Sequence, residues 1–227
     1  MGLSYYSAER EIFKPCYSLF LMANKLSALW IAGICVAFFI FQLIVPGFTD
    51  SLVLNQASVI QPWRFFSAIF LHGSVSHILF NMFALILFGL ILEKIIGSRK
   101  FLLVYFVSGI AANLIAVNFY QSSLGASGAI YGILGCLTIL RPRMTVWVYS
   151  LPMPMFVAAI VWVVAGFLGI FTPSNVGDIA HLSGIAVGFL LGLWFRERES
   201  KVIRNYPGFR VTIDEDKMRN WEDNFLR

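Results

Sequence analysis

The chain has 227 residues, of which 59% are hydrophobic and 13% are charged, and its mean hydropathy is +0.78. A soluble domain carries about 25% charged and 45–50% apolar residues, so this composition excludes a water-soluble globule. The net charge of +5 requires no nucleic-acid partner, because a basic fringe beside anionic membrane lipid accounts for it.

The first 25 residues, 1–25, are expected to form a cytoplasmic N-terminal segment. Their apolar stretch, Tyr17 to Ala23, is too short to cross a bilayer and predicts an interfacial helix. We expect no cleaved signal peptide, because the first long apolar segment begins only at residue 26 and lacks a small-x-small cleavage site.

Six membrane spans follow. A helix that crosses a bilayer needs about 20 mostly apolar residues. The charge-free runs hold six such helices, at roughly 26–45, 72–94, 100–118, 126–141, 153–171 and 178–195. All eight prolines lie outside these ranges, as expected for a residue that breaks helix interiors. The predicted fold is therefore an all-α membrane protein with a six-helix domain over residues 26–195.

The last segment, 196–227, carries eight basic and seven acidic residues and is too short and polar to bury a core. We expect it to be a charged cytoplasmic tail that lies on the membrane face or is partly disordered. With six spans, both termini and the turns near residues 97 and 142 share one side, which holds sixteen of the seventeen Lys and Arg residues. The exception is Arg64. The positive-inside rule therefore places both termini in the cytoplasm.

Polar side chains inside the spans are costly in lipid, so each invites a functional explanation. The candidates are His72, His77, Asn81, Glu93, Asn113, Ser127, Tyr131 and His181. The cysteines, Cys16, Cys35 and Cys136, have no metal-ligand spacing and are interpreted as small buried hydrophobic residues.

The fourth and sixth spans each carry a stripe of glycines. In the fourth, Gly128, Gly132 and Gly135 lie within about 40° of one another on the helix surface, beside Ser127 and Tyr131. In the sixth, the stripe shares a face with His181 and consists of Gly184, Gly188 and Gly192. If the two stripes pack together, Ser127 and His181 come close, which is the minimum apparatus of a nucleophile with its general base. Taken alone, Ser127 would be a packing residue or an N-cap.

The second span adds polar donors at the same depth. His77 and Asn81 are four residues apart and share one helical face. They could donate to a developing oxyanion, as acyl transfer requires, or simply form hydrogen bonds between helices.

Together these residues resemble the rhomboid family of intramembrane serine proteases in its minimal six-helix form. The resemblance runs from about Trp63 to Gly192. It rests on G-A-S-G at Gly125 to Gly128 with Tyr131 following, and on A-H-L-S-G at Ala180 to Gly184. It also rests on the array of His72, His77 and Asn81, on Trp63 and Arg64 in the first outer loop, and more weakly on L-E-K-I-I-G-S at Leu92 to Ser98.

The resemblance implies a role for each matching position. Ser127 would be the nucleophile and His181 its general base, with Tyr131 stacked on the imidazole. His77, Asn81 and the backbone N–H of Ser127 would form the oxyanion hole. His72 would support the outer end of the site, and Trp63 with Arg64 would seat the first loop partly in the outer leaflet. No cofactor and no metal are implied, and we expect neither a large cytosolic domain nor a seventh span.

The sequence thus predicts an endopeptidase that cleaves membrane-anchored proteins in or near their transmembrane segments, through an acyl-enzyme on Ser127. We expect it in the plasma membrane of a prokaryote, with the site opening to the outer face and with transmembrane substrates and lipid as partners. A non-catalytic relative that binds transmembrane clients would be expected to lack the serine or the histidine. A transporter would more naturally place acidic residues in the spans, and a membrane metalloprotease would carry H-E-x-x-H.

Overall fold

The computed structural model describes residues 26–148, 150–171 and 177–205, with side chains up to residue 197. The predictions for Cys16, for the stretch from Tyr17 to Ala23 and for residues 206–227 lie outside the described residues. Within the described part, residues up to Leu193 belong to one compact unit, and Trp194 begins a second.

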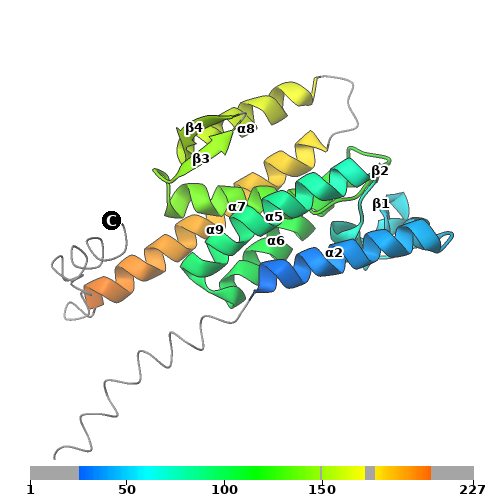
Figure 1. Cartoon of the computed structure of the whole chain (residues 1–227), viewed down its shortest axis with the longest axis horizontal. Coiled ribbons are helices and arrows are strands. Elements are labelled where there is room, and N and C mark those ends of the chain that lie inside the picture. Colours follow the sequence, from blue (N-terminus) through cyan, green and yellow to red (C-terminus); the bar gives the residue numbers. More distant parts are fainter. Residues whose placement is uncertain (1–25, 149, 172–176, 206–227) are drawn as a thin grey trace, which may run out of the picture. The chain divides into compact units, whose positions relative to one another are not determined.

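The predicted all-α membrane fold is confirmed, with an apolar helix in each predicted range (Figure 1). These helices are α2 (Ser27–Ile44), α5 (Val75–Ile96), α6 (Ser98–Ala116), α7 (Ser127–Leu140), α8 (Met155–Gly169) and α9 (Asp178–Asn205). Four of them, α2, α5, α6 and α9, are long and apolar enough to cross a membrane. At 14 and 15 residues, α7 and α8 reach about 21 and 22 Å, which is less than the roughly 30 Å hydrocarbon core.

Two boundaries differ from the prediction by more than two residues. The second helix begins at Val75 rather than at residue 72, because the Ser74 side chain accepts a hydrogen bond from His77 N and caps the helix there. His72 therefore precedes the span instead of lying inside it. The last helix continues past residue 195 to Asn205, through a charged stretch rich in Arg and Glu, which are good helix formers.

Short elements that the sequence analysis did not predict fill the connections. Between α2 and α5 lie α3 (Phe48–Leu52), β1 (Leu54–Asn55), η1 (Gln56–Val59), α4 (Arg64–Ser67) and η2 (Ala68–Phe70). β1 pairs antiparallel with β2 (Ser122–Ser123), with Leu54 opposite Ser123. Between α7 and α8, β3 (Thr145–Val148) and β4 (Leu151–Pro154) form an antiparallel hairpin.

Helix α7 is central to the first unit, where it contacts α5, α6 and α8. Its contacts with α6 are antiparallel: Gly128 faces Ala112, and Gly132 faces Ser108. Each step forward along α7 therefore corresponds to one step backward along α6. This places Ser127 level with Asn113, inside the length of α6 rather than at its end.

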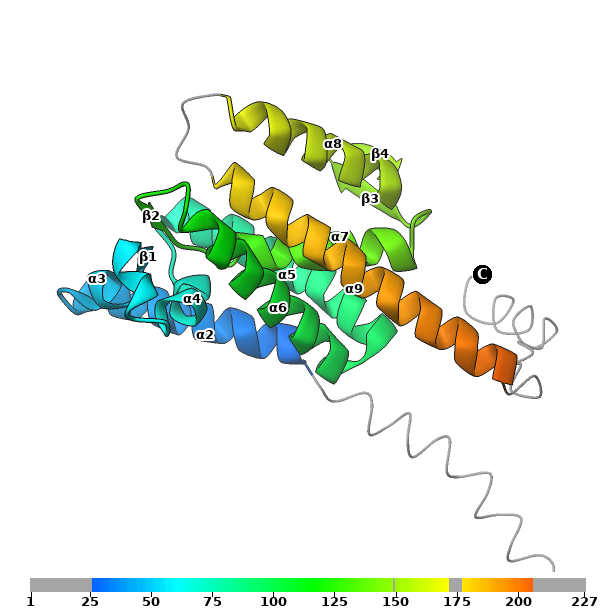
Figure 2. The same ribbon diagram turned by 180° about the vertical axis from the view of Figure 1, so that it is seen from behind.

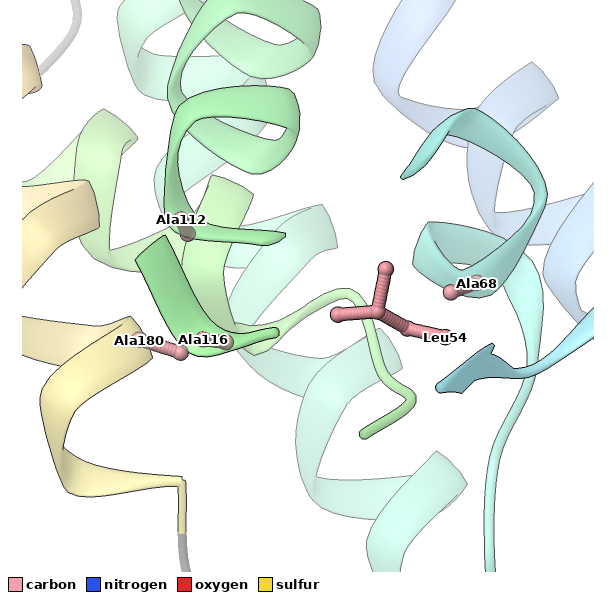
Figure 3. Close-up of a cluster of buried hydrophobic side chains, with 5 residues drawn as sticks. All are labelled: Leu54, Ala68, Ala112, Ala116 and Ala180. Carbon is pink, nitrogen blue, oxygen red and sulfur yellow. The ribbon is translucent and has the colours of Figure 1, made fainter. Parts of the chain in front are cut away.

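Four alanines and one leucine form a core cluster beside the start of α7 (Figure 3). Its members come from four elements and are Leu54, Ala68, Ala112, Ala116 and Ala180. Figure 3 shows Leu54 of β1 between Ala68 of η2 and the end of α6. The cluster thus joins the segment before α5 to α6 and to the first turn of α9, which carries His181.

Candidate active site

The glycine stripes of α7 and α9 face each other at backbone contact, and the two helices run side by side in Figures 1 and 2. A Cβ on Gly184 would overlap the carbonyl oxygen of Gly128, and a Cβ on Gly188 would overlap that of Gly132. Nearer the other end, a Cβ on Gly192 would lie 2.9 Å from Ile139 Cβ. Only residues without a side chain permit this approach.

This approach brings Ser127 and His181 into hydrogen-bond contact. Ser127 is the first residue of α7, and His181 lies in the first turn of α9. The distance from His181 Nε2 to Ser127 Oγ is 2.8 Å. Both side chains are half-buried, so the pair is neither sealed in the core nor fully open to solvent. A hydroxyl hydrogen-bonded to an imidazole nitrogen is the geometry in which the imidazole can accept the hydroxyl proton.

Tyr131 fixes the plane of the imidazole. Its ring stacks on that of His181, with centroids 4.3 Å apart and an interplanar angle of 8°. Tyr131 is one turn beyond Ser127, so α7 supplies both the hydroxyl and the ring that supports its partner. The stack limits rotation of the histidine side chain and keeps Nε2 directed at Ser127.

The N-terminus of α7, where Ser127 lies, leaves backbone N–H groups without an acceptor inside the helix. The first N–H groups of a helix have no acceptor within it, and here the first intrahelical bond runs from Ile130 N to Ala126 O. The preceding Gly125 has a φ of +131°, a conformation that strongly favours glycine, and its N–H donates to Ala68 O at 3.0 Å. Partial positive charge at the helix end favours a negatively charged oxygen at this position.

His77 lies on the other side of the Gly125 turn. A Cβ on Gly125 would be 3.0 Å from His77 Nε2 and 3.7 Å from Ser127 Oγ, so both groups lie close to one point. Asn81, one turn further along α5, is buried, and its Nδ2 donates to His77 O at 2.8 Å. This hydrogen bond is within α5, not between helices, so the simple interhelical alternative does not describe Asn81.

His72 is buried in the loop that precedes α5, and neither of its ring nitrogens has a hydrogen-bond partner. Its ring meets that of His77 edge to face, with centroids 5.2 Å apart. Burial, and secondarily the nearby His77, lower the pKa of His72 from 6.5 to about 4. The ring is therefore neutral at physiological pH and fills space behind His77.

Arg64 is buried rather than projecting from the segment between α2 and α5. Its Nη1 donates to Asp50 O at 2.7 Å and to Val53 O at 2.8 Å, and its Nε donates to Gln61 Oε1. The neighbouring Trp63 is half exposed. Arg64 thus ties α3 and the residue that follows it to α4, while Trp63 remains at the surface of this segment.

Two of the remaining polar candidates have structural partners. Glu93 accepts hydrogen bonds from the backbone N–H groups of Ser27 and Ala28, at 3.0 and 3.1 Å, and so caps α2. Asn113 Nδ2 donates to Phe65 O at 2.8 Å and links α6 to α4. Neither side chain is needed to explain the Ser127 and His181 pair.

Gln42 is a polar residue near the site that the sequence analysis missed. Its side chain, on α2, bonds both the backbone N–H and the carbonyl oxygen of His72. The available signal was an amide near the end of the first predicted span, at the same end as His72.

Comparison with known proteins identifies the family. The model of the Rhomboid domain matches residues 59–198. RHOMBOID-like protein 1 of Arabidopsis thaliana is 35% identical over 147 residues, 64% of this chain and 36% of the relative. The rhomboid protease GlpG of Yersinia pseudotuberculosis is 28% identical over 176 residues, 75% of this chain and 63% of the relative.

The chain therefore spans between about a third and just under two thirds of the length of these relatives. The family match covers more than half of the present chain and includes the helices from α5 to the first part of α9. The chain belongs to the rhomboid family, whose members include intramembrane proteases, and it is an integral membrane protein.

Proposed function

We propose that the protein is an intramembrane serine endopeptidase in which Ser127 is the nucleophile and His181 the general base. The observation that carries the proposal is the 2.8 Å contact between Ser127 Oγ and His181 Nε2, braced by the stacked ring of Tyr131. In a neutral histidine that serves as the base, Nε2 accepts the hydroxyl proton and the ring's own proton is on Nδ1.

The reaction proceeds in two acyl-transfer steps. Ser127 Oγ attacks the carbonyl carbon of the peptide bond while its proton passes to His181 Nε2. The resulting imidazolium returns this proton to the departing amine, and an ester on Ser127 remains. Water then adds to the ester with His181 again taking a proton, and the hydroxyl of Ser127 is restored as the new carboxyl end leaves.

The oxyanion formed in each step is stabilised by the backbone N–H of Ser127, by His77 and by Asn81. The helix terminus and the His77 ring lie on two sides of the Gly125 turn, so donors approach the hydroxyl from separate elements. Asn81 Nδ2 carries a second proton beside the one donated to His77 O, so it can still donate to the oxyanion. Losing one such donor typically costs 10²–10³ in kcat.

The substrates of this reaction are membrane-anchored proteins cut in or near a transmembrane segment. An amide within a helix is hydrogen-bonded and shielded, so the scissile segment must unwind before Ser127 can attack. Both termini are cytoplasmic and the site faces the outer side of a prokaryotic plasma membrane. Supporting this orientation, the exposed basic residues of the first unit lie at the α5–α6 and α7–β3 turns, opposite the Ser127 end of α7.

The decisive test uses a fluorophosphonate probe and a transmembrane substrate with the protein reconstituted in liposomes. We expect the wild type to be labelled on Ser127 and to cut the substrate, with mass spectrometry locating the cut. Ser127→Ala should lose both labelling and cleavage, and His181→Ala should lose cleavage while remaining folded. Binding of the substrate without labelling or cleavage by the wild type would instead establish a non-catalytic client-binding protein.

A further inference from the structure

The β3–β4 hairpin presents one side to its own protein and one side outward. Val146 and Val148 are each only 6% exposed, whereas Trp147 between them is 71% exposed. Trp147 is paired across the hairpin with Pro152, which is also exposed. The hairpin joins the end of α7 to the start of α8 (Figures 1 and 2). An exposed Trp beside a membrane helix is typical of the bilayer interface.

The turn that leads into the hairpin is positively charged. Arg141 and Arg143 are both exposed, and Arg141 Nη1 donates to Leu140 O at the end of α7. The sequence contains no Asp or Glu between Glu93 and Asp178, so no carboxylate in this stretch offsets these charges.

The depth of this turn follows from the antiparallel contacts of α6 and α7. Gly132 lies level with Ser108, so Leu140 lies level with Lys100, near the first turn of α6. Arg141 and Arg143 are thus at the level of the exposed Arg99 and Lys100, where α6 leaves the membrane. The hairpin therefore lies beside the lipid headgroups on the side away from Ser127.

We propose that the β3–β4 hairpin binds anionic phospholipid headgroups of this leaflet, with Arg141 and Arg143 on the phosphates and Trp147 in the interface. The turn before β3 is hydrogen-bonded to the start of α8, because Met155 N donates to Met144 O at 2.8 Å and Phe156 N to Pro142 O at 3.1 Å. Lipid binding therefore anchors the inner end of α8, whose other end lies beside the start of α9.

The test combines lipid retention with the depth of Trp147. In native mass spectrometry we expect the double variant Arg141→Gln with Arg143→Gln to bind phosphatidylglycerol about 30-fold more weakly than the wild type, with phosphatidylcholine binding unchanged. The emission of Trp147 is obtained as the difference between the wild type and Trp147→Phe. We expect lipid brominated near the headgroup to quench this emission and aqueous iodide not to quench it. Trp63→Phe, at the other end of the bundle, is the matched control for retention and should leave it unchanged.

Retention of phosphatidylglycerol by the double variant at the wild-type level would overturn the proposal, as would iodide quenching of Trp147. A disulfide-linked dimer through Thr145→Cys, in a chain with Cys16→Ser, would assign the surface to a second copy instead and would equally overturn it.

A separate observation concerns Gln42, whose amide matches both backbone groups of His72. His72 N donates to Gln42 Oε1 at 2.9 Å, and Gln42 Nε2 donates to His72 O at 3.2 Å and to Thr49 Oγ1 at 3.1 Å. The Gln42 side chain thus forms the two hydrogen bonds that a neighbouring β-strand would form with His72. These bonds fix the peptide units on either side of His72. The next residue, Gly73, lies against the His77 ring.

The contact between Gly73 and His77 selects one tautomer. Gly73 N donates to His77 Nδ1 at 3.4 Å, and a ring nitrogen that accepts a hydrogen bond carries no proton. The proton of the neutral ring is then on Nε2, the nitrogen beside Gly125 and Ser127. Only this tautomer can donate from Nε2 to an oxyanion.

We infer that Gln42 is a positioning residue that sets the tautomer of His77 through the backbone of His72 and Gly73. The inference rests on the proposed function for the role of His77 as an oxyanion donor. Its structural part, the tautomer, is independent of turnover. Loss of the Gln42 amide is therefore expected to weaken stabilisation of the transition state, which lowers kcat, more than it weakens substrate binding, which would raise KM.

The chain contains three histidines, so ring ¹⁵N labelling resolves each of them. In the wild type we expect His77 to be protonated on Nε2 and bare on Nδ1. Gln42→Leu should mix the two tautomers and lower kcat about tenfold with KM unchanged. Thr49→Val, which removes only the other partner of the amide, is the matched control and should keep the wild-type spectrum and kcat.

A His77 signal that is the same in Gln42→Leu and in the wild type would overturn the inference, and so would Nδ1 protonation in the wild type. Failure of the proposed function would be seen in a different experiment, as a lack of fluorophosphonate labelling at Ser127. The ¹⁵N spectrum of His77 does not depend on that labelling and would remain as predicted.

Discussion

The contact between α7 and α9 can be tested by adding one methyl group. In Gly184→Ala, the new Cβ would overlap the carbonyl oxygen of Gly128, so the two helices must separate by about 1 Å to restore an ordinary contact. Ser127 and His181 are on these two helices, and their 2.8 Å hydrogen bond would lengthen by a similar amount. A misplacement of about 1 Å can cost about 10²-fold in rate, and overpacking typically costs about 1–3 kcal/mol of stability.

The assay is the rate of fluorophosphonate labelling at Ser127, measured beside thermal unfolding in the same detergent. Gly192→Ala should be milder, because its Cβ meets Ile139 Cβ at 2.9 Å and Cys136 O at 3.1 Å, and it lies further from His181. Gly33→Ala on α2 meets nothing within 4 Å and should match the wild type. Wild-type labelling and stability in Gly184→Ala would refute the argument that backbone contact holds the pair together.

Three further predictions follow from single contacts. Glu93→Gln should lower the free energy of unfolding by about 1–2 kcal/mol, because the charged cap of α2 is lost. Ser98→Ala removes only the hydroxyl that donates to Glu93, and thermal unfolding should show a smaller loss for it. Tyr131→Phe keeps the stacked ring and should retain cleavage, whereas Tyr131→Leu should lower kcat about 3- to 10-fold; equal rates for the two variants would exclude stacking as the cause. The pKa of His72 falls from 6.5 to about 4 on folding, so below pH 6.5 the unfolded chain binds a proton that the folded protein does not. The stability of the fold is therefore unaffected by the titration of His72 above pH 6.5 and decreases as the pH falls toward 4. Between pH 6.5 and 4, the free energy of unfolding of the wild type should therefore fall by up to about 3 kcal/mol more than that of His72→Asn, which keeps the other two histidines. Unfolding scans at a series of pH values measure this difference, and parallel pH profiles of the two proteins would contradict the prediction.

Much of the fold was predictable because lipid imposes few alternatives. Charge-free runs of about 20 residues have one stable form in a bilayer, a helix, and each predicted range contains one. The glycine stripes were informative for the same reason, since small residues at four-residue spacing have little use in lipid except close approach. The proximity of Ser127 and His181 follows from that spacing and from the shared depth of the two residues.

Features that depend on particular hydrogen bonds, local or between distant segments, could not be predicted from the sequence. The start of α5 is set by the Ser74 side chain, whereas the predicted range also took His72, Gly73 and Ser74 into the helix. The β3–β4 hairpin has no turn dipeptide of the usual kind, so no signal in the sequence predicted it. Gln42 is 30 residues from His72, and neither residue alone indicates that its partner is a backbone unit.

The shortness of α7 connects the fold to the chemistry. Because Ser127 is level with Asn113, the first turn of α7 begins inside the bundle, about 4–5 Å before α6 ends. The free N–H groups of a helix start would each cost several kcal/mol in hydrocarbon, so we expect water or a ligand oxygen to satisfy them at this position. Under the proposed function, hydrolysis needs the same two things, water and stabilisation of an oxyanion. A helix that started at the membrane surface would satisfy its N–H groups in bulk water and would place Ser127 outside the bundle that positions His181.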